Sequence, residues 1–186
     1  MDTDEKSAIS HWIAFGFCIN NYIRNHDFFE LLPSMVQHQI HDIIQSLDKI
    51  ISKSVITFDQ FQMIVSFQKD PNPQLFRAIW GSYAKEITDK LDKKFSSIDP
   101  DPGFESWTAN INIAKTKFIN EKSRHNVIFI TDCNVNEKAL FLGTDAYEIL
   151  FPRHTAWRII SHNVFEEDGR TITFIYVKKR TIHNRG

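Results

Sequence analysis

Two charged residues lie within apolar stretches of the sequence, where burying a charge is costly unless the charge is used. Glu148 directly precedes the apolar residues 149–151 and has no basic residue beside it. Arg77 lies in the middle of LFRAIW, residues 75–80, where its guanidinium needs an anion unless it reaches water at a sheet edge. Both are candidates for a functional site, or else they form a structural ion pair with each other.

The first part of the chain, residues 1–70, is expected to be helical and to act as a cap or a partner-recognition region. Apolar residues at steps of three and four predict three helices, over residues 5–25, 34–51 and 58–67. Ser34 and Thr57 are the expected N-caps of the second and third helices. The two prolines of residues 70–74 end the helical pattern.

Strands dominate residues 71–186. The expected strands cover residues 75–80, 104–108, 127–131, 147–151, 156–165 and 171–178, and the expected helices cover residues 83–95 and 113–120. Because helices fall only between the earlier strands, the arrangement is not a regular βαβ alternation. We therefore expect an α+β fold with a curved or split mixed sheet.

Composition limits the class of protein. The formal net charge is −1, so no overall basic field indicates nucleic-acid phosphates as the main partner. Cys18 and Cys133 have neither disulfide-framework nor metal-site spacing, and Cys133 is expected in an exposed loop. His38 and His41 share a helix face without a further ligand, so no metal site is expected.

The N-terminal segment has the features of neither a signal peptide nor a membrane span. We therefore expect no membrane partner, and a protein that is cytoplasmic or delivered into a host cytosol without a cleaved signal peptide.

Three segments, in this order, resemble the motifs of the ADP-ribosyltransferases of the Arg–Ser–Glu class, which includes cholera-toxin-like, clostridial and phage enzymes. They are LFRAIW with Arg77, FESWTANINIAKTKF with Ser106, Trp107, Thr108 and Phe118, and YEILFPRHTAWRI with Glu148. The resemblance covers about residues 72–178. It implies a split mixed β-sheet ADP-ribosyltransferase core over residues 71–186, preceded by the N-terminal helical region.

The resemblance also implies NAD as substrate. Glu148 would stabilise the positive charge that develops on the ribose, and nicotinamide leaves as a neutral ring that needs no general acid, unlike ordinary glycosides. Arg77 would bind the diphosphate, and Ser106 would orient Glu148 and the ribose. The implied NAD-binding set is completed by Trp107, Thr108 and Phe118. For Trp107, ordinary core packing is an alternative.

The acceptor of the ADP-ribose is not identified by the sequence. Family members that modify arginine carry a second acid two residues before the catalytic glutamate, where this chain has Ala146. Asp145 is one residue away, which in a strand points to the opposite face. The family resemblance assigns acceptor recognition to the segment before Glu148, with Phe141, Asp145 and Tyr147 as candidates. For Phe141 and Tyr147, ordinary packing is an alternative.

We expect a mono-ADP-ribosyltransferase that modifies a macromolecule at a group other than arginine. A protein is the favoured acceptor, and nucleic acid stays open. Two alternatives are an NAD glycohydrolase of the same fold and a catalytically inactive binding module.

Overall fold

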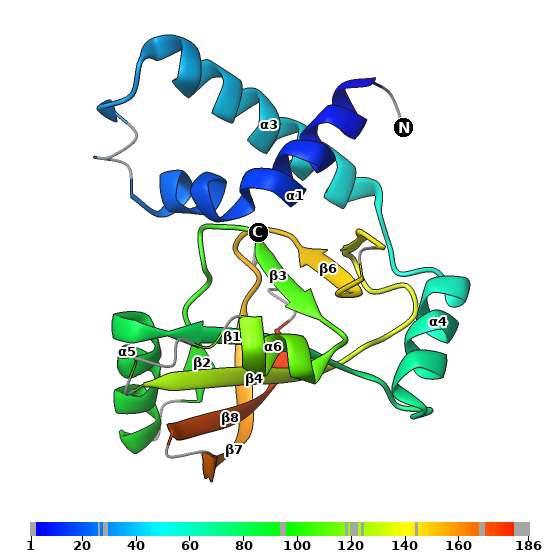
Figure 1. Ribbon diagram of the computed structural model, residues 1–186, viewed down its shortest axis with the longest axis vertical. Coiled ribbons are helices and arrows are strands. Elements are labelled where there is room, and N and C mark those ends of the chain that lie inside the picture. Colours follow the sequence, from blue (N-terminus) through cyan, green and yellow to red (C-terminus); the bar gives the residue numbers. More distant parts are fainter. Residues whose placement is uncertain are drawn as a thin grey trace, which may run out of the picture.

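The computed structural model describes residues 3–25, 27, 30–93, 96–117, 119, 123, 125–143, 145–167 and 170–180. Two long helices, α1 (Thr3–Arg24) and α3 (Ser34–Lys53), pack against each other at one end of the molecule (Figure 1). Helix α4 (Phe58–Gln68) connects them to the sheet and flanks it on one side. None of the described helices is long and apolar enough to cross a membrane.

A mixed sheet forms the rest of the described chain, together with helices α5 (Gly81–Asp92) and α6 (Ile111–Lys117). Its strands are β1 (Gln74–Trp80), β2 (Ser97–Ile98), β3 (Glu105–Thr108), β4 (Asn126–Asp132), β5 (Leu140–Phe141), β6 (Glu148–Phe151), β7 (Trp157–Glu167) and β8 (Arg170–Lys179). The order is β2-β7-β8-β4-β1-β3-β6-β5, and β4 and β8 run parallel while the other neighbours are antiparallel. The predicted α+β class with a mixed sheet is confirmed.

Among the described strands, β1 and β3 are the neighbours with the fewest paired residues. Strand β1 pairs with β4 from Gln74 to Trp80, but it pairs with β3 only through Phe76 and Thr108. Beyond that pair the two strands separate, which is the split that the sequence predicted. Because Arg77 follows Phe76, and Ser106 precedes Thr108 by two residues, the motif residues of both strands lie where the sheet opens.

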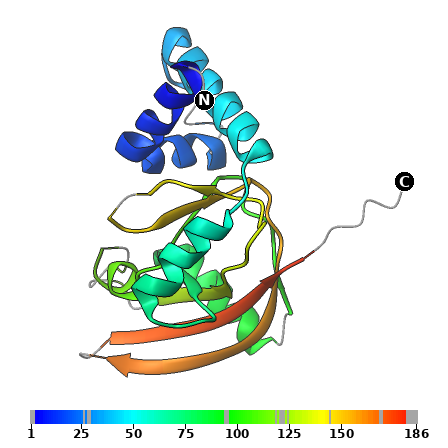
Figure 2. The ribbon, with the colours of Figure 1, turned by 90° about the vertical axis from the view of Figure 1, so that its right-hand side faces the viewer.

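The helical end and the sheet share buried apolar residues. One cluster joins Trp12 of α1 and Leu47 of α3 to Phe104 and Leu150, which lie on or beside β3 and β6. A larger cluster packs α4 and α5 against the sheet, and it includes Ile64, Ile87, Leu75, Trp107 and Ile149. Figure 2 shows α1 and α3 lying above the olive-yellow strands β5 and β6.

The N-cap of α4 was predicted correctly, and that of α3 was not. The Thr57 hydroxyl accepts the backbone N–H of Gln60, and the Gln60 side chain accepts the backbone N–H of Thr57. Ser34 is instead the first residue of α3, after Pro33 in the N-cap position, and it makes no capping hydrogen bond. Proline has no side-chain oxygen that could accept a backbone N–H of the first turn, so the helix begins without a side-chain cap.

Two short strands and one strand boundary differ from the sequence prediction. Strands β2 and β5 lie in segments that were expected to be loops, because two-residue strands are defined by their pairing with β7 and β6 rather than by a local pattern. The strand expected to start at Tyr147 starts at Glu148, because Tyr147 has a left-handed φ of 48°. Gly81, with φ 77°, provides the turn from β1 into α5. The sequence also has a turn signal at residues 167–169, between the last two expected strands, and its residues 168 and 169 lie outside the described residues.

Cys133 is buried rather than exposed in a loop, because its backbone N–H donates to the Pro73 carbonyl and holds the residue against the sheet. Burial, together with the charge of Glu137, raises the pKa of its thiol to about 12. Cys18, on α1, is exposed.

We therefore expect a disulfide reagent at pH 8 to modify Cys18 rapidly and Cys133 only after unfolding, followed by absorbance of the released chromophore. Cys18→Ser should remove the fast phase. Two equally fast thiols in the folded protein would contradict the burial of Cys133.

The pKa of Cys133 in the folded protein exceeds the ordinary thiol value. The contribution of Cys133 to the free energy of unfolding should therefore be lost as the pH rises above that ordinary value.

Candidate active site

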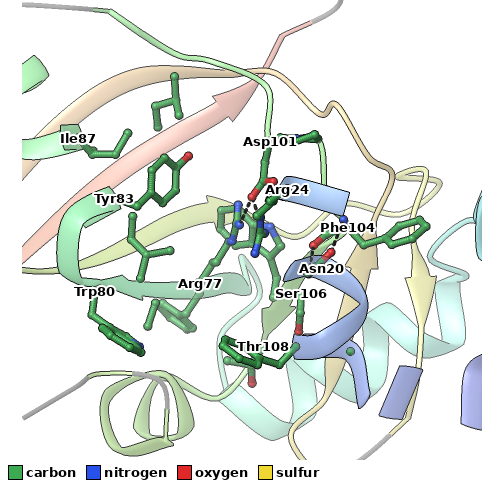
Figure 3. A pocket seen from close by; sticks show the side chains of 18 of the residues that line it. Asn20, Arg24, Arg77, Trp80, Tyr83, Ile87, Asp101, Phe104, Ser106 and Thr108 are labelled. Atoms are coloured by element: carbon green, nitrogen blue, oxygen red, sulfur yellow. Dashed lines mark hydrogen bonds and ion pairs between the residues drawn. The ribbon is translucent and has the colours of Figure 1, made fainter. Parts of the chain in front are cut away.

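A cleft with a volume of about 890 Å³ opens where β1 and β3 separate. Its size is in the range of small-molecule and cofactor sites. Residues of α1, β1, α5, β3 and the 98–102 segment line it, as does the first residue of β6 (Figure 3). The cleft brings together five residues that the sequence motifs named: Arg77, Ser106, Trp107, Thr108 and Glu148.

Glu148 is held by a hydrogen bond from the neighbouring strand. In the antiparallel register, Thr108 lies opposite Glu148 and Ser106 lies opposite Leu150, so Ser106 and Glu148 share one face of the sheet. The Ser106 Oγ donates to Glu148 Oε1 at 2.5 Å. The indole Nε1 of Trp12 also donates to Glu148 Oε1, at 3.4 Å. The carboxylate is half-buried at the edge of the cleft.

Thr108 fixes the segment that leads into Glu148. Its hydroxyl donates to the backbone carbonyl of Ala146 and accepts the backbone N–H of Asn110. The backbone N–H of Ala109 donates to the Tyr147 carbonyl at 3.3 Å. Thr108, the last residue of β3, and Ala109, which follows it, therefore hold in place the two residues that directly precede Glu148.

Arg77 is enclosed by two carboxylates. Its Nη2 lies 2.7 Å from Asp101 Oδ2, and its Nη1 lies 3.1 Å from Glu105 Oε2. Burial by itself would lower the pKa of Arg77, but Glu105 and Asp101 outweigh burial and raise it. Arg77 is therefore a fixed cation whose ion pairs are with acids other than Glu148.

Asp101 connects Arg77 to helix α1. Arg24 binds Asp101 through two nitrogens, with Nε 2.9 Å from Oδ1 and Nη2 2.7 Å from Oδ2, and Figure 3 shows both arginines at this carboxylate. The backbone N–H of Gly103 also donates to Asp101 at 2.8 Å. Burial acts to raise the pKa of Asp101, but Arg24 and Arg77 outweigh it and lower the pKa.

Glu105 lies on the other side of Arg77 and is only 1% exposed. Its Oε2 accepts hydrogen bonds from the indoles of Trp107 and Trp157, at 3.1 and 2.8 Å. Burial raises the pKa of Glu105, while Arg77 and the two indoles act to lower it. Trp107 itself is buried against Trp157 and Phe151, so it borders the floor of the cleft while packing in the core.

Four residues of this site were not predicted from the sequence: Trp12, Arg24, Asp101 and Glu105. A signal existed for Glu105, a charged residue between Phe104 and Ser106 in a predicted strand. No local signal marks Arg24 or Trp12, because they reach the cleft only through the docking of α1. Asp101 lies in a segment that reads as an ordinary acidic loop.

The three acceptor-recognition candidates lie outside this cleft. The half-buried Phe141 is on β5 and packs against the core, and Asp145 is exposed in a turn. Strand alternation does not apply to Asp145, because residues 145–147 are not part of a strand and β6 begins at Glu148. Tyr147 stacks on Phe67 of α4, with ring centroids 4.4 Å apart, and lines a separate shallow hollow. Phe118 lies outside the described residues.

Within the described part of the chain, no group of histidine, cysteine, aspartate and glutamate side chains is arranged to hold a metal ion. The ionic groups that line the cleft include Arg24 and Arg77, which share the Asp101 carboxylate, as well as Glu86, Lys90 and Asp99. Glu148, at the edge of the cleft, is held by the neutral donors Ser106 and Trp12.

Compared by sequence, the chain matches no protein-family model and no curated protein. Compared by structure, it is similar to bacterial ADP-ribosyltransferase toxins. C3larvin from Paenibacillus larvae has 16% identity and a TM-score of 0.63, with 97% of each chain covered. Plx2a from the same organism has 15% identity and a TM-score of 0.68, covering 97% of this chain and 88% of that one.

Vis toxin from Vibrio splendidus has 16% identity and a TM-score of 0.64, covering 100% of this chain and 77% of that one. In all three comparisons the similarity extends over the N-terminal helices as well as the sheet, because nearly the whole of this chain is aligned. The chain therefore has the fold of the ADP-ribosyltransferases, as its Arg, Ser and Glu motifs predicted.

Proposed function

We propose that this protein is a mono-ADP-ribosyltransferase that cleaves NAD and transfers ADP-ribose to a macromolecule. The observation that carries the proposal is the Glu148 carboxylate, which accepts the Ser106 hydroxyl at 2.5 Å at the edge of a cleft that also contains Arg77. The similarity of the fold to ADP-ribosyltransferase toxins supports it.

The chemistry needs few groups. The bond between nicotinamide and ribose breaks with its electron pair going to nicotinamide, which leaves neutral and without a proton. The ribose becomes an oxocarbenium-like cation, and a carboxylate that accepts a hydrogen bond from the ribose 2′-hydroxyl stabilises it electrostatically. Glu148, oriented by Ser106, has this role in the proposal. The acceptor then forms a bond to the ribose carbon and loses a proton.

The residues of the cleft suit the diphosphate of NAD. Arg24 and Arg77 lie side by side on Asp101, and guanidinium groups bind phosphate oxygens well. Arg24 is the more accessible cation, because its side chain is 36% exposed whereas that of Arg77 is 10% exposed. We assign direct diphosphate contact mainly to Arg24, with Arg77 as the fixed charge behind it.

Hydrolysis of NAD is a second candidate function. The position two residues before Glu148 is Ala146, and its carbonyl is already bound to Thr108. The chain therefore provides no carboxylate at the place where arginine-modifying relatives have one. An acceptor other than arginine, or water, is consistent with this.

The proposal is tested by incubating the purified protein with NAD and following released nicotinamide. We expect release to be faster than the spontaneous rate, and labelled ADP-ribose on a protein acceptor distinguishes transfer from hydrolysis. If no nicotinamide is released, NAD binding is measured by calorimetry. Absence of both binding and release would contradict the proposal and favour an inactive binding module.

A further inference from the structure

Helix α1 reaches the candidate catalytic carboxylate through Trp12. This residue is only 4% exposed, and its Nε1 donates to Glu148 Oε1 at 3.4 Å. The edge of its ring packs on Phe104, with centroids 5.6 Å apart and planes at 78°. Phe104 directly precedes β3, which carries Ser106. The indole therefore contacts β6 at Glu148 and the residue that directly precedes β3.

Gly16, one turn along α1, is what allows the indole to lie there. A Cβ atom on Gly16 would be 2.9 Å from the Trp12 ring, with two further ring atoms at 3.0 and 3.1 Å. Between the two residues, Phe15 leaves helical geometry, with φ −136° and ψ 18°. The Trp12 ring lies against the helix where a side chain at residue 16 would otherwise stand, so any other residue at Gly16 must displace it.

The same side of α1 is fastened to the site at two more places. The side chain of Asn20 exchanges two hydrogen bonds with the backbone of Phe104, both at 2.9 Å. Arg24 binds Asp101, which in turn binds Arg77. Since Asn20 and Arg24 follow Gly16 at steps of four, α1 holds Trp12 in register with the catalytic strands.

We propose that Trp12 is a positioning residue for Glu148 in the NAD-cleaving reaction, and that Gly16 leaves the space that its indole ring needs. This inference rests on the proposed function. The terminal torsion of a glutamate side chain is broad, so a single hydrogen bond leaves the carboxylate plane free to rotate. Donors from two different elements, Ser106 and Trp12, meet at Oε1 and fix that plane. The second oxygen, Oε2, is left to accept from the ribose hydroxyl.

The test is Trp12→Phe, which keeps an aromatic ring and removes the N–H donor. Hydrogen bonds to charged groups are the stronger ones, and we expect kcat for nicotinamide release to fall about tenfold. Because Trp12 acts on Glu148 and not on the diphosphate, the dissociation constant for NAD should change less than about twofold. A purely structural defect would instead lower kcat in proportion to the folded fraction and would raise the apparent dissociation constant for NAD by the same factor.

Gly16→Ala tests whether the indole needs the space at residue 16, and it leaves the Trp12 side chain itself unchanged. Alanine favours a helix more than glycine does, so a loss of kcat similar to that of Trp12→Phe points to displacement of the indole. Leu47→Ala is the matched control, since Leu47 is fully buried in the same apolar cluster and belongs to α3. It should destabilise the fold and leave kcat per folded molecule unchanged.

Three outcomes are decisive. A fall in kcat for Trp12→Phe and Gly16→Ala, but not for Leu47→Ala, supports the inference. Wild-type kcat in Trp12→Phe, or an equal loss in Leu47→Ala, overturns it while leaving the proposed function intact. Absence of nicotinamide release from the unaltered protein overturns the proposed function, and this role of Trp12 with it.

Discussion

Replacing Glu148 with glutamine is expected to lower the rate of nicotinamide release about 100- to 1,000-fold, the usual cost of removing a preorganised electrostatic group. Glutamine has nearly the same shape and can still accept the Ser106 hydroxyl through its amide oxygen, so the site stays assembled. It loses the negative charge, which is what stabilises the ribose cation. The effect should therefore fall on kcat and spare NAD binding.

The measurement is single-turnover release of nicotinamide, with the dissociation constant for NAD determined by calorimetry on the same samples. Ser106→Ala is the informative companion variant. It keeps the carboxylate and removes the shorter of its two hydrogen bonds, so its loss of rate should be smaller than that of Glu148→Gln. If Glu148→Gln kept the full rate, another group would have to stabilise the cation, and Glu148 would be only a structural partner of Ser106.

Local sequence patterns predicted the strands that carry the site. LFRAIW became β1 and the apolar run after Glu148 became β6, because short runs rich in apolar, β-branched and aromatic residues favour a strand. The pairing of β3 with β6 then brings Ser106 to Glu148, since their separation across the ladder is set by register. The motif residues themselves were named from the family resemblance, before their contacts were known.

Contacts between distant segments could not be predicted in the same way. Arg77 was expected to need an anion, and a ligand phosphate was the implied one. In the structure, the anions beside Arg77 are Asp101 and Glu105. These contacts depend on the path of the chain that leads into β3. Trp12 and Arg24 reach the site because α1 docks on β3, an arrangement set by the packing of whole elements and by the space that Gly16 and Gly103 leave.

The buried ion pairs of Arg77 give the second large expectation. Arg77→Met should lower the free energy of unfolding by about 3–5 kcal/mol, because it leaves the buried Glu105 without its guanidinium partner. Arg153→Met is the matched control. Arg153 also forms an ion pair through two nitrogens, here to the single carboxylate of Asp48, but both side chains are partly exposed, so its loss should cost no more than about 1 kcal/mol. Denaturant unfolding measures both.

The pH dependence of this loss has a definite sign. Burial raises the pKa of Glu105, and Arg77 acts against that rise, so removing Arg77 lets the pKa rise further. A group whose folded pKa is raised contributes stability at low pH and loses it as the pH increases. The deficit of Arg77→Met should therefore be largest at neutral pH and should shrink as the pH falls toward the ordinary range of a glutamate.

A double variant separates the structural role of Arg77 from its proposed role toward NAD. In Arg77→Met with Glu105→Gln, no buried carboxylate lacks its partner at that position, and the glutamine oxygen can still accept the indoles of Trp107 and Trp157. Most of the lost stability should return, since a buried ion pair can often be replaced by neutral groups at little cost. If NAD binding stays weak in the stable double variant, the charge of Arg77 acts on the ligand. If binding returns with stability, Arg77 serves the fold, and the diphosphate is held by Arg24.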